Sequence, residues 1–119
     1  MGLGGLTPCC EAVVEPQDWG KLEWMVSGAI GNSDTMTVGR CTIAPGQQNP
    51  PHYHPNCDEV LHVISGMIDH RLGDKQLLMS EGDTISIPQG TVHNARNIGS
   101  GPAVLMITFS TAYREVIGE

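Results

Sequence analysis

Two histidines near the middle of the chain have the residue type and the spacing of metal ligands. His52 and His54 are two positions apart, and residues at that spacing on a strand point to the same face of the sheet. The prolines at positions 50, 51 and 55 favour an extended backbone around the pair. The sequence therefore predicts that both imidazoles reach one point in space.

A carboxylate and a third histidine follow on later segments. Glu59 begins an apolar segment in which it alternates with Leu61 and Val63, so its side chain is expected to face the core. A carboxylate buried among apolar side chains is costly unless it is paired or binds a cation. His93 begins a further predicted strand and alternates with the small residue Ala95. Both side chains are therefore candidates for the same site.

Three imidazoles and one carboxylate make a metal site on ligand chemistry alone. Nitrogen and oxygen ligands without thiolate suit Mn, Fe, Ni, Co, Cu or Zn, and we expect one such divalent metal per chain. Its ligands would be His52, His54, Glu59 and His93. In a six-coordinate site these four ligands leave two positions open, and open positions distinguish catalytic metal sites from structural ones. The set therefore predicts a metal that can bind a substrate.

At these residues the chain resembles the cupin superfamily through two sequence motifs. The first, over residues 46–66, is Gly46, five residues, His52-Tyr53-His54, four residues, Glu59, six residues and Gly66. The second, over residues 82–97, is Gly82, five residues, Pro88-Gln89-Gly90, two residues, His93, three residues and Asn97. Both patterns are complete and in the expected order. They are specific for the fold and the metal site but do not identify the reaction, because this fold hosts many chemistries.

The resemblance implies an all-β fold, a single-domain cupin barrel of the double-stranded β-helix (jelly-roll) type. It also implies metal ligation by the same three histidines and Glu59. The local sequence at residues 50–55 and 88–90 is similar to that of germins and oxalate-acting cupins, which carry Mn and transform a small dicarboxylate. Germins also carry a secretory signal and an N-terminal disulfide extension, and neither is visible in this sequence.

The remaining sequence agrees with a fold of many short strands. Segments of about four to eight residues rich in Val, Ile and Thr recur with turn signals roughly every 8–12 residues, as in sandwiches and barrels. Strands are predicted at 22–27, 36–44, 58–64, 67–72, 76–79, 84–87, 92–97 and 103–110. We expect residues 1–17 to form an N-terminal arm or edge strand and residues 18–119 to form the barrel. Only residues 112–117 have the pattern of a short helical turn.

Composition excludes several classes of function. The 119 residues suit one domain, and the 39% of hydrophobic residues suffice for a core. Six Lys and Arg against 13 Asp and Glu give a net charge of −7 without a basic cluster, which argues against binding of nucleic acid or anionic membranes. The longest apolar run, 103–107, is far too short to span a membrane. We therefore expect a cytoplasmic protein whose four cysteines are free thiols.

The leading functional hypothesis is a metal-dependent enzyme for a small oxygenated metabolite, which would be a carboxylate, a diketone or enol, or a sugar acid. The substrate, and O₂ if the metal is redox-active, would occupy the open positions and give dioxygenase, oxidase or decarboxylase chemistry. A non-redox isomerase or lyase of a sugar acid is the second hypothesis, and it needs a general base that the sequence does not identify. The third is a non-catalytic cupin that keeps the metal to anchor a ligand.

Several other residues allow more than one interpretation. Arg40 lies in a predicted strand whose inward face is ambiguous, so its guanidinium either clamps a substrate carboxylate or lies at the surface. Asn97 either supports the metal site or bonds the strand end, and His70 is expected at the surface. Trp19 and Trp24 are expected to anchor packing rather than to bind carbohydrate. We expect a homodimer, because the edge strands of a short barrel benefit from being covered.

Overall fold

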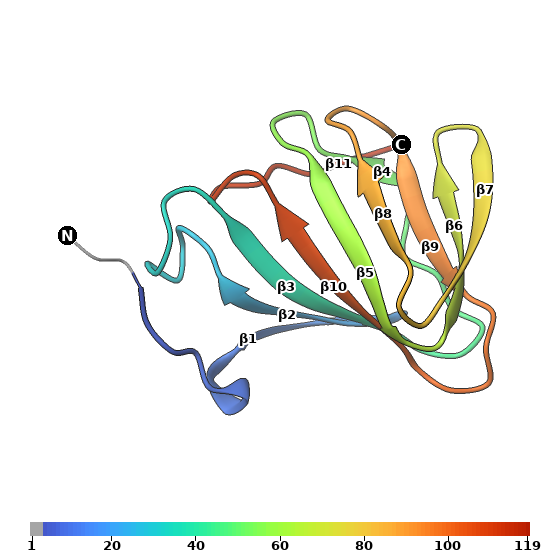
Figure 1. Cartoon of the computed structure of the whole chain (residues 1–119), viewed down its shortest axis with the longest axis horizontal. Helices are drawn as coiled ribbons and strands as arrows, with labels where there is room; N and C mark the ends of the chain where they lie inside the picture. The colour runs from blue at the N-terminus through green and yellow to red at the C-terminus, as the bar shows by residue number, and fades with distance from the viewer. Residues whose placement is uncertain (1–3) are drawn as a thin grey trace.

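Short strands separated by tight turns dominate the structure, a computed structural model that describes residues 4–119 (Figure 1). The strands are β1 (Val13–Gln17), β2 (Gly20–Val26), β3 (Thr37–Ile43), β4 (His52–Tyr53), β5 (Glu59–Ser65), β6 (Met67–Leu72), β7 (Lys75–Ser80), β8 (Thr84–Ile87), β9 (His93–Asn97), β10 (Ala103–Phe109) and β11 (Ile117–Gly118). The helical element of the described chain is a single 3-10 turn, Cys9–Glu11. The predicted all-β fold is thus confirmed. No helix within residues 4–119 is long and apolar enough to cross a membrane.

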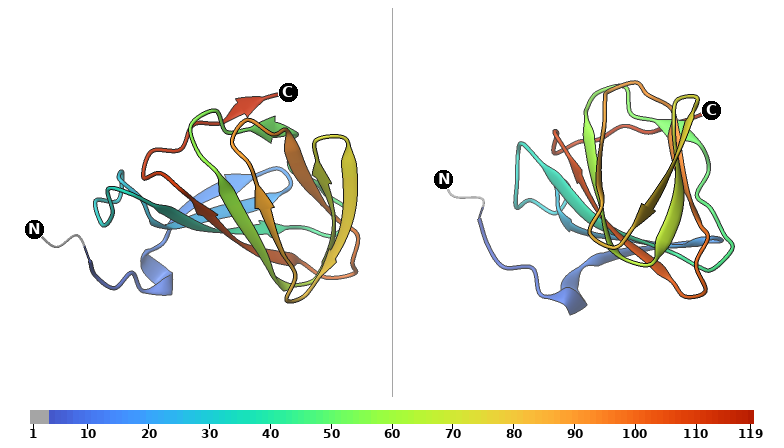
Figure 2. Two further views of the ribbon diagram at one scale, coloured as in Figure 1. Left: turned by 45° about the horizontal axis from the view of Figure 1, so that its top comes forward. Right: turned by 45° about the vertical axis from the view of Figure 1, so that its right-hand side comes forward.

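The strands form two antiparallel sheets that curve around a common interior (Figure 2). One sheet has six strands in the order β1-β2-β3-β10-β5-β8, and the other has five in the order β11-β4-β9-β6-β7. The chain passes from the first sheet to the second between β5 and β6, at Gly66. Gly66 has a φ of 94°, and a Cβ there would lie 2.9 Å from the Cα of Ala103. This corner of the barrel therefore requires glycine, which explains the last position of the first motif.

The core lies between the sheets and follows the two-residue period of the strands. In β3, β5 and β10 every second residue is buried, which gives an inward face of aliphatic and aromatic side chains. Among them Ile43, Val63, Leu105 and Phe109 are at most 2% exposed. Burying one such side chain contributes roughly 1.5–3 kcal/mol to folding. Glu59 lies on the same inward face of β5, as its alternation with apolar residues predicts.

One segment departs from its predicted structure. Residues 112–117 do not form a helical turn; the chain is irregular there until β11, where Ile117 pairs with Tyr53 and Gly118 with His52. The apolar residues of this segment have the spacing of a helical turn, but the chain gains more from adding a strand beside β4 than from one isolated turn. The end of the described chain is therefore tied to the strand that carries the first predicted ligand.

Asn97 serves the strand end rather than the metal site. Its side-chain amide donates hydrogen bonds to the backbone carbonyls of Ile43 and Gly101, both at 2.8 Å, and its side-chain oxygen accepts one from the Gly99 N–H at 2.9 Å. The side chain is 1% exposed and does not line the cavity described below. It holds the turn between β9 and β10 onto β3.

We therefore predict that Asn97→Ala lowers the free energy of unfolding by about 2–3 kcal/mol, because it removes buried hydrogen bonds to the Ile43 and Gly101 carbonyls and to the Gly99 N–H. Urea denaturation measures this loss. Metal content per chain should stay that of the wild type. The neighbouring Arg96→Ala, on the exposed face of β9, is the control and should change stability by less than about 0.5 kcal/mol. An Asn97→Ala variant as stable as Arg96→Ala would contradict this role.

Candidate metal centre

Pairing between strands brings the four predicted ligands together from both sheets. His52 in β4 lies directly opposite His93 in β9, and their ring centroids are 4.4 Å apart. His54 follows β4 by one residue, with its ring centroid 5.0 Å from that of His52 and 5.2 Å from that of His93. Glu59, the first residue of β5, enters from the facing sheet. The extended backbone that the flanking prolines favour is what turns both His52 and His54 inward.

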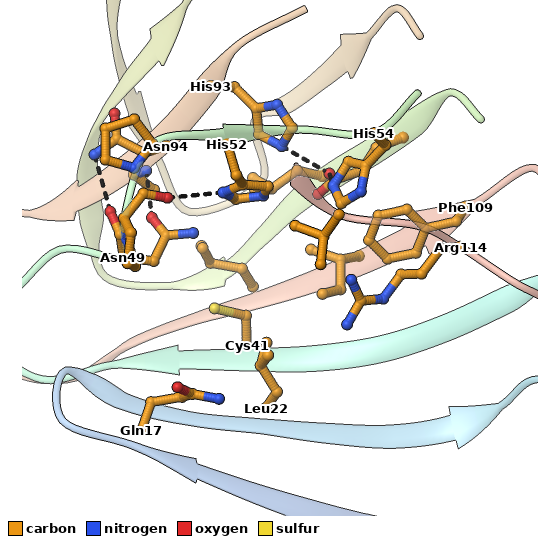
Figure 3. A pocket seen from close by; sticks show the side chains of 18 of the residues that line it. Gln17, Leu22, Cys41, Asn49, His52, His54, His93, Asn94, Phe109 and Arg114 are labelled. Atoms are coloured by element: carbon orange, nitrogen blue, oxygen red, sulfur yellow. Dashed lines mark hydrogen bonds and ion pairs between the residues drawn. The ribbon is translucent and has the colours of Figure 1, made fainter. Parts of the chain in front are cut away.

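The donor atoms of these side chains form one cluster (Figure 3). One nitrogen from each histidine and one oxygen of Glu59 all lie within 4.8 Å of one another. The Glu59 Oε1 is 3.0 Å from the His93 Nε2 and 3.2 Å from the His54 Nε2. Donors bound to one metal ion at about 2.1 Å are themselves about 3 Å apart, so these separations suit a shared cation.

Backbone carbonyls fix the orientation of all three imidazoles. The Nδ1 of His52 is 2.8 Å from the Pro50 oxygen, that of His54 is 2.7 Å from the Glu115 oxygen, and that of His93 is 2.9 Å from the Thr91 oxygen. A carbonyl oxygen only accepts, so each Nδ1 carries the proton and donates it. In a neutral ring the Nε2 then presents a lone pair toward the cluster, which is the arrangement of histidines that ligate metals.

The lone pairs of the imidazole nitrogens and of the Glu59 oxygen therefore face one another, with too few protons to form a hydrogen bond between each pair. The His54 Nε2 is buried and finds no hydrogen-bond donor among the described residues, although the Glu59 carboxylate lies beside it. Two acceptors in contact repel unless a proton or a metal ion lies between them. The three nitrogens and one oxygen thus fit a divalent transition metal, whose binding would release any proton held there.

The pKa values of His52 and Glu59 favour the protonation states that a metal requires, whereas that of His93 favours a proton that a metal would displace. Burial lowers the pKa of His52 to about 4, so this ring is neutral at neutral pH. Burial alone would raise the pKa of Glu59, but the adjacent His54 and His93 hold it down to about 2. Burial opposes protonation of His93 as well, yet the ionised Glu59 raises its pKa. A negative carboxylate beside imidazoles of fixed tautomer attracts a cation electrostatically.

The cluster opens onto a cavity of about 400 Å³ inside the barrel. This volume lies within the range of small-molecule sites. Its walls are largely apolar and include Trp19, Leu22, Trp24, Leu105 and Phe109. A ligand in the cavity would therefore contact the four donors at one end and apolar side chains along its length.

A family model described as a cupin domain matches residues 39–109, which include all four donors. The chain belongs to the cupin family. Germin-like protein 5-1 of rice (Oryza sativa subsp. japonica) is 36% identical to this cupin over 89 residues, which cover 67% of this chain and 38% of that protein. Germin-like protein subfamily 1 member 10 of Arabidopsis thaliana is 35% identical over 102 residues, covering 77% of this chain and 45% of that protein. The cupin chain thus spans less than half the length of these relatives.

Solved structures agree with the fold of this cupin. The oxalate decarboxylase of Lactobacillus farciminis, in a formate complex, superposes with a TM-score of 0.85 at 20% identity, covering 92% of this chain and 34% of that one. A recombinant oxalate oxidase in complex with glycolate gives a TM-score of 0.67 at 25% identity, covering 71% of this chain and 46% of that one. At 20% identity, the match to the decarboxylase supports the barrel fold alone. The likeness to germins rests on the sequence relatives.

Arg40 does not reach the cavity. Thr37, Gly39, Cys41 and Ile43 of β3 face inward, so Arg40 lies on the opposite face. There its Nε donates to the Glu23 carboxylate at 3.1 Å. Arg40 therefore lies at the surface, and its guanidinium does not clamp a substrate carboxylate in the cavity.

Trp19 and Trp24 pack against the core as expected, and both also form part of the cavity wall.

The prediction that His70 lies at the surface is wrong. His70 is fully buried in β6, with its ring 6.0 Å from that of His93 and nearly parallel to it, at 10°. Neither ring nitrogen has a hydrogen-bond partner within residues 4–119. Its charged neighbours Asp69 and Arg71 suggest a surface segment, but they occupy the other face of the strand. The alternation with the buried Ile68 is the signal that places His70 inside.

Sequence reasoning missed Arg114, which lines the cavity from the irregular segment before β11. No strand period or motif spacing applies to such a segment, so the sequence holds no signal for the direction of the Arg114 side chain.

Asn49 and Asn94 also line the cavity, and the backbone oxygen of Asn49 accepts a hydrogen bond from the Asn94 side-chain amide at 3.1 Å. Asn49 precedes the two prolines of the first motif, which is a local signal that could have been used.

For the metal-free protein we predict that His70 makes stability depend on pH. Burial lowers the pKa of His70 from 6.5 to about 4, so the unfolded chain binds the additional proton between these values. Stability then falls as pH drops from 7 to 5, by about 1–2 kcal/mol from this group. In His70→Leu the fall should be smaller by that amount, as measured by urea denaturation at both pH values. His62→Leu, on the other face of β5, is the control; an unchanged fall in His70→Leu would contradict the assignment.

Proposed function

We propose that this cupin is a metal-dependent enzyme that acts on a small oxygenated metabolite, such as a carboxylate, a diketone or enol, or a sugar acid. The observation that carries the proposal is the cluster of three imidazole nitrogens and one carboxylate oxygen at the end of a cavity large enough for a small molecule. Four protein ligands leave open positions on a six-coordinate metal. When bound there, the metal would act as a Lewis acid toward substrate oxygen and, if redox-active, exchange electrons with O₂.

The protein residues would hold the metal, orient its ligands and keep water away from the substrate. The carbonyls of Pro50, Glu115 and Thr91 keep the three imidazoles in the tautomer that binds metal. The apolar wall excludes bulk water from the reacting atoms, which strengthens every electrostatic interaction inside the cavity. Mn is the first metal to test, because a structural neighbour, the Bacillus subtilis oxalate decarboxylase, is described by its Mn(II) centers.

Oxidase, dioxygenase or decarboxylase chemistry has more support than isomerase or lyase chemistry. Enolisation needs a general base, and the other titratable side chains in the described cavity wall are Glu15, Cys41 and Arg114. Burial raises the pKa of the Cys41 thiol to about 12, so it stays protonated. Glu15 belongs to the exposed strand β1, whereas the metal ligands come from β4 and the residue after it, β5 and β9. The structural neighbours named as an oxalate oxidase and an oxalate decarboxylase agree with oxidase or decarboxylase chemistry.

Metal binding is tested by removing one ligand. Protein purified without a His tag should carry about one divalent transition metal per chain by elemental analysis, and His52→Ala should lower metal affinity by at least about a hundredfold. His62→Ala is the matched control, because His62 lies on the outward face of β5, where its Nδ1 contacts the Thr84 hydroxyl at 2.7 Å. Equal metal content in both variants would refute the site.

Turnover separates an enzyme from a metal-anchored binding protein. The metal-loaded protein is incubated with small acids, diketones and uronates, and O₂ uptake and product formation are measured. We expect turnover of at least one class, lost in His52→Ala and kept in His62→Ala. Tight, reversible binding of these compounds with no turnover by the loaded protein would refute the enzymatic proposal and favour the non-catalytic module.

A further inference from the structure

Arg114 places a cation inside the same cavity as the metal ligands. Its guanidinium carbon lies 4.2 Å from the centre of the Trp24 ring and 5.3 Å from that of Phe109. The Phe109 ring also contacts His54, with centroids 5.0 Å apart. Figure 3 shows Arg114 beside Phe109, reaching into the cavity on the side away from His93. The cation and the metal cluster are therefore separated by one phenyl ring.

The charge of Arg114 has no carboxylate partner in the described part of the chain. Arg40, Arg71 and Arg96 each form an ion pair, with Glu23, Glu119 and Asp69 respectively. Arg114 forms neither an ion pair nor a side-chain hydrogen bond with residues 4–119, and its guanidinium lies over the faces of two aromatic rings.

Arg114 is partly buried, and this partial desolvation adds to the cost of its unpaired charge. Burial lowers the pKa of Arg114, and the attraction of Glu15 and Glu59 only partly offsets this effect. Neither carboxylate comes within ion-pair distance of it. A partly desolvated and unpaired guanidinium gains from an incoming anion, and a carboxylate matches its two parallel N–H donors.

Most of the wall of the cavity that the cation and the metal cluster share is apolar. Its apolar residues include Leu22, Leu105 and Ile107 together with Trp24 and Phe109. The cavity of about 400 Å³ has room for on the order of ten water molecules, more than a two-carbon acid needs. The walls therefore suit an apolar segment with a polar group at each end.

From this geometry we infer that the substrate carries a carboxylate separated by an apolar segment from the oxygen atoms that face the metal, and that Arg114 holds that carboxylate. The inference rests on the proposed function, because it assumes that the opposite end of the substrate binds at the metal. It makes Arg114 the residue that determines specificity, by favouring substrates whose far end is anionic.

The test uses paired hydroxamates, which bind metals through one end. Adipic acid monohydroxamate and hexanohydroxamate have the same metal-binding group and the same number of carbons, but only the first ends in a carboxylate. Binding of each to the metal-loaded protein is measured by titration calorimetry. We expect the wild type to prefer the carboxylate-terminated compound by about tenfold or more, as for a charge-assisted hydrogen bond.

Three variants separate the anionic contact from general effects. Arg114→Gln should bind both compounds equally, whereas Arg114→Lys, which keeps a cation, should retain part of the preference. Arg96→Gln removes the same charge from the exposed face of β9 and should retain all of it. Circular dichroism and metal content confirm that each variant is folded and loaded.

The possible results are distinct for the two proposals. Equal binding of the pair by the wild type, a preference that survives in Arg114→Gln, or no binding of either compound by loaded protein would overturn the role of Arg114 while leaving the metal site intact. Failure of the wild type to take up metal, measured before any hydroxamate is added, would instead overturn the proposed function.

Discussion

The contact between the Glu59 carboxylate and two imidazole lone pairs is the constraint on which the rest of the site depends. Oxygen and nitrogen lone pairs 3.0 and 3.2 Å apart, in a buried position, repel unless a proton or a metal ion lies between them. The fold holds them there because Glu59 comes from one sheet while His52 and His93 are cross-strand neighbours in the other. The cluster is therefore complete only when the two sheets face each other.

The outer contacts of the histidines show how the backbone itself supports this cluster. Each imidazole uses its Nδ1–H on a main-chain oxygen, so no side chain is required to set its tautomer. Two of these oxygens, from Pro50 and Thr91, lie two residues before the histidine they orient. The third belongs to Glu115 and is distant in sequence. Local geometry thus orients His52 and His93, and tertiary structure orients His54.

The sequence was informative wherever a side chain's direction follows from local periodicity. The inward positions of His52, His54 and Glu59 follow from alternation along strands and from the prolines beside them, and the all-β fold follows from short strands between turns. The same alternation would have placed His70 inside, but the charges of Asp69 and Arg71 concealed it. Arg40 was ambiguous because both faces of β3 carry apolar or small residues. Arg114 had no period to follow, because its segment is irregular.

The last ten residues of the chain act on the site at two points. The Glu115 carbonyl orients a metal ligand, and the adjacent Arg114 sits in the cavity. Both lie beyond residue 109, where the match to the family model ends. A protein could thus keep both motifs intact and still differ in ligand geometry and in the molecules it admits. In this chain, replacing Arg114 or displacing the Glu115 carbonyl would change the charge of the cavity or the orientation of His54 without altering any metal donor.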